Sequence, residues 1–259
     1  MKAYCDIYSA HNIRDLDYSY QNLFLPISSI FNSYEGVEAI HSDTTHYFIL
    51  DVGNELDRKI NVIKQFRDSG IKVVVFTFDP ANFNRIRRYI EMHVIDKVIV
   101  FSKKFENSFK CNTFFTDYFF LQDMFNPVDK INNGKVCMYG RIDINRPNDY
   151  SLDVIDINAK SIKDIYKNIQ KYNGVATYDE GWNEDWSALD HYNKARATET
   201  LMCGRIPYCK DGIITKRYNK FLSKYSQIPS PIDIMFDQHE IWEINKLTLL
   251  ELKYELDNA

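Results

Sequence analysis

Hydrophobic residues along this chain alternate between short continuous runs and stretches in which apolar positions recur at helical spacing. The run at 71–78 (Ile-Lys-Val-Val-Val-Phe-Thr-Phe) predicts a strand buried on both faces. In the segment before it, 54–69, apolar residues such as Leu56 and Ile60 stand four positions apart, which predicts an amphipathic helix. Gly70 follows as a helix terminator. A helix that leads into a buried strand is therefore expected here.

The same criteria predict a repeated alternation of strands and helices over the rest of the chain. Strands are expected at 3–8, 46–52, 71–78, 96–101, 135–140, 153–157, 175–178 and 206–209. Helices are expected at 54–69, 81–92 and 162–172, around Arg196, as one or two closing helices over 237–256, and in part over 15–34 with a break at Pro26. This order is typical of parallel sheets covered by helices, in which ligands bind at the carboxyl ends of the strands.

A segment rich in turn-forming residues, 126–134, divides the alternation into two parts. We therefore predict an α/β protein of two small Rossmann-like halves around a central cleft. The first domain is expected over 1–130. The second is expected over 131–259, with a closing C-terminal helix that crosses back to the first half.

Composition narrows the classes of function. The net charge of −4 gives no global attraction for nucleic acid, so a polyanionic partner would need a local basic patch. The 5 cysteines form no C-x-x-C pair, which argues against a disulfide framework and for a reducing, cytoplasmic compartment. No signal-peptide pattern and no apolar run of membrane-spanning length is present, so no membrane partner is expected. The 6 histidines lack metal-ligand spacing, which predicts no protein metal cage.

The most informative motif is the block from Arg196 to Pro207, which contains Glu199 and Gly204. An Arg and a Glu three residues apart lie on one helix face, and Gly204 is expected to end that helix before a short strand. Arginine binds phosphate oxygens and glutamate accepts hydroxyl hydrogens, so the pair suits a ligand with both phosphate and sugar groups. The alternative is an ordinary surface ion pair.

Asp79 directly follows the buried strand at 71–78, which places it at the carboxyl edge of the predicted sheet. A carboxylate there can act as a general base when partial burial raises its pKa. The alternative is an Asp-Pro turn or a helix N-cap before the helix at 81–92.

A second candidate phosphate site follows the strand at 135–140. Tyr139 and Gly140 end that strand, and Arg141 and Arg146 lie in the loop after it. Gly140 would let the backbone approach a ligand closely, and the two arginines suit a diphosphate. The alternative is a solvated polar loop.

Basic residues gather after the strands of the first half: Arg85, Arg87, Arg88, Lys103 and Lys104. Aromatic residues lie among them, at Tyr89, Phe105 and Phe109. This interleaving could hold nucleic-acid phosphates and stack a base, or it could be a solvated helix face. The acidic and aromatic segment 179–186 could similarly bind a sugar or form a capped helix start.

Taken together, these motifs resemble the GT-B nucleotide-sugar glycosyltransferases, and most closely the phage DNA β-glucosyltransferases, which glucosylate 5-hydroxymethylcytosine in viral DNA. The family's Arg-x-x-Glu-Thr reads Arg196-Ala-Thr-Glu199-Thr here. The Tyr139-Gly140-Arg141 strand end is similar, although the spacing to Arg146 differs from the family pattern. The family's catalytic Asp follows a strand ending in Phe-Thr, and Asp79 lies one residue further along. The first strand lacks the Gly-rich turn common in the family, and the chain is short for the fold.

The resemblance implies transfer of a sugar from a UDP-sugar to a hydroxyl acceptor by direct displacement, with inversion at the anomeric carbon. Arg196 and Arg141 would contact the diphosphate, Glu199 the ribose, and Asp79 the acceptor hydroxyl. No cofactor is required, although Mg²⁺ or Mn²⁺ could accompany the donor diphosphate. The acceptor implied is hydroxymethylated double-stranded DNA in a phage-infected host cytoplasm. Two alternatives stay open: a glycan, lipid, protein or small-molecule acceptor, and a non-catalytic nucleotide or nucleotide-sugar binding protein.

Overall fold

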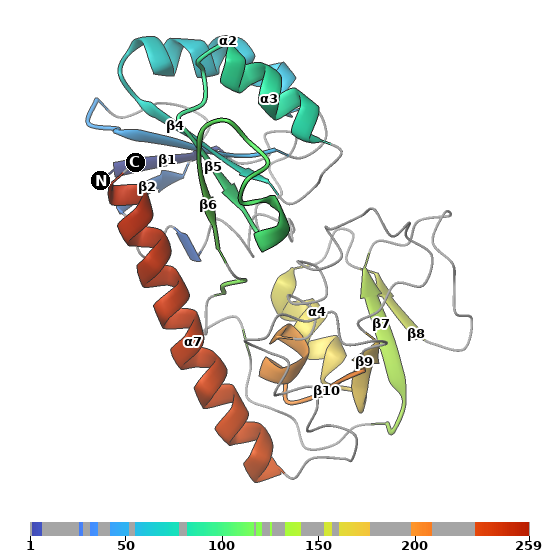
Figure 1. Ribbon diagram of the computed structural model, residues 1–259. Helices are drawn as coiled ribbons and strands as arrows, with labels where there is room; N and C mark the ends of the chain where they lie inside the picture. The colour runs from blue at the N-terminus through green and yellow to red at the C-terminus, as the bar shows by residue number, and fades with distance from the viewer. Residues whose placement is uncertain are drawn as a thin grey trace.

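The strands of this protein pair in parallel, in two separate sheets (Figure 1). The computed structural model describes residues 2–6, 26–27, 32–35, 42–51, 55–77, 82–116, 118–120, 125, 133–140, 153–156, 161–176, 198–208 and 231–258. The fold is therefore mixed α/β with parallel sheets, as the alternating pattern predicts.

The first sheet has six strands in the order β2-β1-β3-β4-β5-β6. Its strands are β1 (Lys2–Asp6), β2 (Asn32–Glu35), β3 (His46–Leu50), β4 (Lys72–Thr77), β5 (Lys97–Val100) and β6 (Asn112–Phe115). From β1 the chain moves outward to β2 on one side, and from β3 it moves outward to β6 on the other. The strand order therefore reverses between β1 and β3, and a parallel sheet binds its ligands beside such a reversal.

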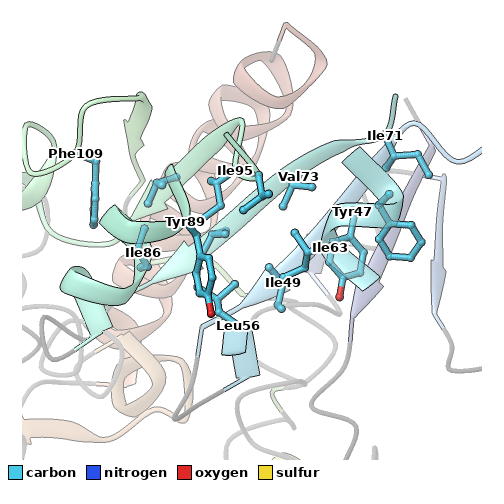
Figure 2. Packing of buried hydrophobic residues seen from close by; sticks show 14 of the residues in the cluster. Tyr47, Ile49, Leu56, Ile63, Ile71, Val73, Ile86, Tyr89, Ile95 and Phe109 are labelled. Carbon is cyan, nitrogen blue, oxygen red and sulfur yellow. The ribbon is translucent and has the colours of Figure 1, made fainter. Parts of the chain in front are cut away.

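Alternation along the inner strands gives the first sheet two apolar faces. Tyr47, Ile49 and Val73 point to the face covered by helices α2 (Glu55–Asp68) and α3 (Phe83–Glu91), as Figure 2 shows. The intervening residues of the same strands point to the opposite face. Burial on both faces explains why these strands read as continuous apolar runs.

The opposite face is covered by the long C-terminal helix α7 (Pro231–Asp257), which also extends beside the second sheet (Figure 1). Leu249, Leu252 and Leu256 pack into the core of the first sheet at helical spacing. The buried ammonium of Lys97 on β5 binds the Glu255 carboxylate at 3.1 Å and the Glu255 carbonyl oxygen at 2.7 Å. Helix α7 therefore returns to the first sheet.

The second sheet has four strands in the order β10-β9-β7-β8. They are β7 (Val136–Gly140), β8 (Asp153–Asp156), β9 (Gly174–Ala176) and β10 (Ile206–Tyr208). Helix α4 (Ile162–Ile169) packs its apolar residues against this sheet, and its first turn is capped by the Ser161 hydroxyl, which accepts from the Asp164 N–H at 3.1 Å.

Two parts of the first sheet were not predicted from the sequence. Residues 32–35 form strand β2, which overlaps the end of the segment 15–34 that was expected to be helical in part. Strand β6 and the 3₁₀ turn η3 (Lys103–Phe105) were not expected at all. Both β2 and β6 are edge strands, which bury less of their surface and therefore carry weaker apolar patterns.

The closing segment is one helix, and it starts at Pro231, where a missing N–H costs nothing. None of the described helices has the length and apolarity that a bilayer crossing requires.

Candidate functional site

The block identified from sequence folds as a helix end followed by a sharp turn into β10. Residues 198–202 are helical, and Gly204 adopts a positive φ of 68°. The Gly204 N–H donates to the Leu201 carbonyl at 2.8 Å, and the Arg205 N–H donates to the Thr200 carbonyl at 2.9 Å. These bonds satisfy the last carbonyls of the helix, as in a glycine C-cap. The predicted stop at Gly204 is confirmed.

Glu199 lies at the centre of this block and is 0% exposed. Its Oε1 accepts a hydrogen bond from the Tyr118 hydroxyl at 2.7 Å, and its Oε2 accepts one from the Tyr139 hydroxyl. Hydrogen bonds from two phenols compensate the burial of a carboxylate, which would otherwise be costly. The structure thus brings Glu199 and Tyr139 together, and the sequence analysis assigned both residues to one donor site.

Two further contacts fix the block to its neighbours. The Gln238 amide of α7 donates to the Leu201 and Met202 carbonyls, each at 3.0 Å. The buried Arg205 guanidinium donates through Nε to the Gln170 carbonyl at 2.9 Å, at the C-terminal end of α4. Arg205 lies inside the quoted motif, but sequence reasoning assigned it no role. The block is therefore held between α4 and α7.

Burial also makes the cysteine of this block inert. Desolvation, with the nearby negative charge of Glu199, raises the pKa of the Cys203 thiol well above its ordinary value. A thiol in this state carries almost no thiolate at neutral pH, so it does not act as a nucleophile. Among the described residues of the block, Glu199 can offer a ligand the oxygens of its carboxylate.

Other residues assigned to the donor site are only partly placed. Gly140 ends β7 and is buried beside Tyr139. Arg141, Arg146 and Arg196 lie outside the described residues, as does the acidic and aromatic segment 179–186.

In the first half, the predicted base Asp79 lies outside the described residues, but another carboxylate follows the neighbouring strand β3. Asp51 directly follows β3, at the carboxyl edge where the strand order reverses, and its side chain is buried. Arg85 binds the Asp51 carboxylate at 2.9 Å and the Asn82 amide oxygen at 2.7 Å. The Asn82 amide donates to the Asp51 carbonyl at 3.0 Å.

Sequence reasoning missed Asp51, although the signal was available. The run at 46–52 was taken as strand through Val52, so Asp51 was counted within it. The strand ends at Leu50, and the pattern that drew attention to Asp79, a carboxylate after a buried strand, also fits Leu50-Asp51. The hydrogen bonds among Asp51, Asn82 and Arg85 hold the C-terminal end of β3 next to the N-terminal end of α3.

The arginines of α3, proposed as a basic patch, are largely engaged within the protein. Arg85 binds Asp51, and Arg88 binds the Asp57 carboxylate of α2 together with the Tyr89 hydroxyl. Arg87 is exposed and donates to the Ser108 carbonyl at 3.3 Å.

The remaining members of the patch divide between surface and core. Lys103 is exposed, and the side chain of Lys104 lies outside the described residues. The three aromatic residues proposed to stack a base belong to the core beneath α3. Tyr89 and Phe109 are buried there, and Phe105 packs edge-on against Phe83 with ring centroids 4.7 Å apart.

No cluster of three or more His, Cys, Asp or Glu side chains suited to a metal ion occurs in the described part of the chain. In the comparisons with known proteins, no family model matches the chain and no curated protein matches its sequence.

Proposed function

We propose that this protein is a nucleotide-sugar glycosyltransferase with two halves of GT-B type. The observation that carries the proposal is the position of Glu199. This buried carboxylate is bound by Tyr118, which follows the last strand of the first sheet, and by Tyr139, which lies in the second sheet. The Arg-x-x-Glu motif, the glycine turn at Gly204 and the return of α7 to the first sheet all support it. In this proposal the second half, 131–259, binds the donor and the first half, 1–130, binds the acceptor.

The reaction is a single displacement at the anomeric carbon of a UDP-sugar. Asp79 removes the proton from the acceptor hydroxyl, whose oxygen forms the new bond to that carbon. The bond between the anomeric carbon and the β-phosphate oxygen breaks, and UDP leaves with the electron pair. Arg141, Arg146 and Arg196 neutralise the departing diphosphate, and Glu199 accepts hydrogen bonds from the ribose hydroxyls. Attack from the face opposite the leaving group inverts the anomeric configuration.

For the acceptor, the described residues favour a glycan, lipid, protein or small-molecule hydroxyl over duplex DNA. Arg85 and Arg88 are paired with carboxylates, which cancels much of the positive charge that a DNA phosphate backbone would need. Among the described members of the patch, Arg87, Arg88 and Lys103 are exposed, but Arg88 is paired with Asp57, and the net charge of −4 offers no wider attraction. DNA remains the second candidate because of the resemblance to the phage enzymes.

The donor site is tested by measuring UDP binding to the wild type and to Glu199→Gln, which keeps the size of the side chain but removes its charge. We expect the variant to bind UDP at least ~10-fold more weakly, since one charge-assisted hydrogen bond contributes about 1.5–3 kcal/mol. Glu243→Gln, an exposed glutamate on α7, is the matched control and should bind like the wild type. Equal UDP affinity in all three proteins would refute the donor site.

Turnover is tested separately by UDP release from UDP-glucose, with hydroxymethylated duplex DNA or a panel of glycans as acceptor. Asp79→Asn should abolish release without weakening UDP binding, and full turnover in that variant would refute the base assignment. Addition of EDTA measures whether Mg²⁺ or Mn²⁺ contributes. UDP binding without release on any acceptor would instead favour a non-catalytic nucleotide-binding protein.

A further inference from the structure

Glu199 is bound by two tyrosines that come from different parts of the fold. Tyr139 lies on β7, where it pairs with Ile155 of β8, and its side chain belongs to the core of the second sheet. Tyr118 follows the end of β6, the last strand of the first sheet. The hydrogen bond from Tyr118 to Glu199 therefore joins a segment that follows the first sheet to the block from Arg196 to Pro207. The hydrogen bond from Tyr139 comes instead from the core of the second sheet.

The backbone around Tyr118 is anchored to the first sheet and α7. Phe119 packs into the apolar core that α7 shares with the first sheet. The Phe120 N–H and carbonyl each bond to the Asn245 side chain at 2.9 Å. Tyr118 therefore lies on a segment anchored to the first sheet and α7, whereas Glu199 lies in the block beside the second sheet, which α7 also contacts through Gln238.

Together the two phenols close off the carboxylate. Each oxygen of Glu199 accepts one tyrosine hydroxyl, and the side chain has no exposed surface. A pair of ribose hydroxyls reaches these oxygens only when one phenol withdraws. Both tyrosines are 3% exposed, but Tyr139 lies on a paired strand and in the core of the second sheet, whereas Tyr118 lies outside any strand, so we assign the withdrawal to Tyr118.

We propose that Tyr118 is a latch that competes with the donor ribose for Glu199, and that Tyr139 is a positioning residue that keeps Glu199 oriented toward the donor. The inference rests on the proposed function, because it takes the ribose to bind at Glu199. Donor binding exchanges the Tyr118 hydroxyl for ribose hydroxyls on the same carboxylate, and so releases the direct hydrogen bond between Tyr118 and Glu199. In the absence of donor the latch satisfies the buried carboxylate.

The two tyrosines then have opposite effects on nucleotide affinity. Tyr118→Phe removes the competitor and should tighten UDP binding about 5- to 10-fold, which is the size of one net hydrogen bond. Tyr139→Phe removes the group that orients Glu199 and should weaken UDP binding by about the same factor. A purely structural role predicts no gain in affinity for either variant, because loss of a buried hydrogen bond only destabilises the fold.

The experiment is isothermal titration of UDP, and of 2′,3′-dideoxy-UDP, into the wild type, Tyr118→Phe and Tyr139→Phe. Tyr47→Phe, which removes a buried phenol from the first-sheet core, is the control and should bind UDP like the wild type. The gain in Tyr118→Phe should disappear with the dideoxy nucleotide, since that ligand lacks the hydroxyls that need Glu199. Tyr118→Met, which also lacks the hydroxyl, replaces Tyr118→Phe if that variant does not fold.

The outcomes separate the latch from the proposed function. UDP binding by the wild type with unchanged or weaker binding by Tyr118→Phe overturns the latch alone. A gain of equal size with the dideoxy nucleotide also overturns it, because the ribose would then not be the competitor. Failure of the wild type and every variant to bind UDP overturns the proposed function, and the latch with it.

Discussion

Replacing Asn245 by alanine should remove a specific contact between α7 and residues 118–120, which follow the last strand of the first sheet. The Asn245 side chain is fully buried, and its amide forms two hydrogen bonds of 2.9 Å with the backbone of Phe120. Alanine leaves both backbone groups buried without these partners. A buried polar group without a partner costs about 1–3 kcal/mol, so we expect a loss of about 2–5 kcal/mol in the free energy of unfolding. At about 2–4 °C per kcal/mol for a chain of this size, the melting temperature should fall by about 4–20 °C.

Urea unfolding followed by far-UV circular dichroism measures this loss, with the melting temperature as a second readout. Asn258→Ala is the matched control: its amide donates to the Tyr254 carbonyl at the exposed end of α7. That substitution should change stability by less than about 0.5 kcal/mol, as exposed positions usually do. A loss below about 1 kcal/mol in Asn245→Ala, or one no larger than in the control, would refute the reasoning that burial gives this contact its value.

Three further predictions concern buried titratable groups. Burial, together with the charge of Lys72, lowers the pKa of His46 to about 4 from its ordinary 6.5. The fold favours the neutral form of His46, which contributes up to about 3 kcal/mol to the free energy of unfolding. This contribution is complete above pH 6.5 and is lost as the pH falls from there through 4. His46→Gln should therefore show a flatter loss of stability than the wild type between pH 6.5 and 4, and parallel curves would contradict the assignment. Lys97→Ala should lower the free energy of unfolding in urea by about 2–4 kcal/mol. Lys97→Met, which keeps the buried aliphatic part of the side chain, should lower it by at least about 1 kcal/mol less. Equal losses would show that packing of this aliphatic part does not stabilise the fold. Burial raises the pKa of Cys137 to about 12 and that of Cys203 well above its ordinary value, so neither thiol should react with iodoacetamide at pH 8 until urea unfolds the protein, as peptide mass spectrometry would show.

Among the strands that sequence reasoning located, β3 and β4 are those with the clearest apolar runs, and the first sheet buries them on both faces. Residues 46–50 and 72–77 supply continuous apolar runs because helices cover them above and below. The edge strand at 32–35, Asn-Ser-Tyr-Glu, has no such run, and its pairing with β1 depends on hydrogen bonds that any sequence can make. Helix ends were located wherever a glycine with positive φ ends them, as at Gly70 and Gly204.

At the candidate site, the sequence by itself determined the local features and only the tertiary structure decided their partners. Helical periodicity and the glycine after it place Glu199 near a helix end, because both effects act within a few residues. The two phenols that bind its carboxylate come from Tyr118 and Tyr139, at sequence separations of 81 and 60 residues. Asp51 similarly meets Arg85 from 34 residues away. Such contacts depend on the packing of sheets and helices against one another, and no short-range pattern in the chain encodes which side chains that packing brings together.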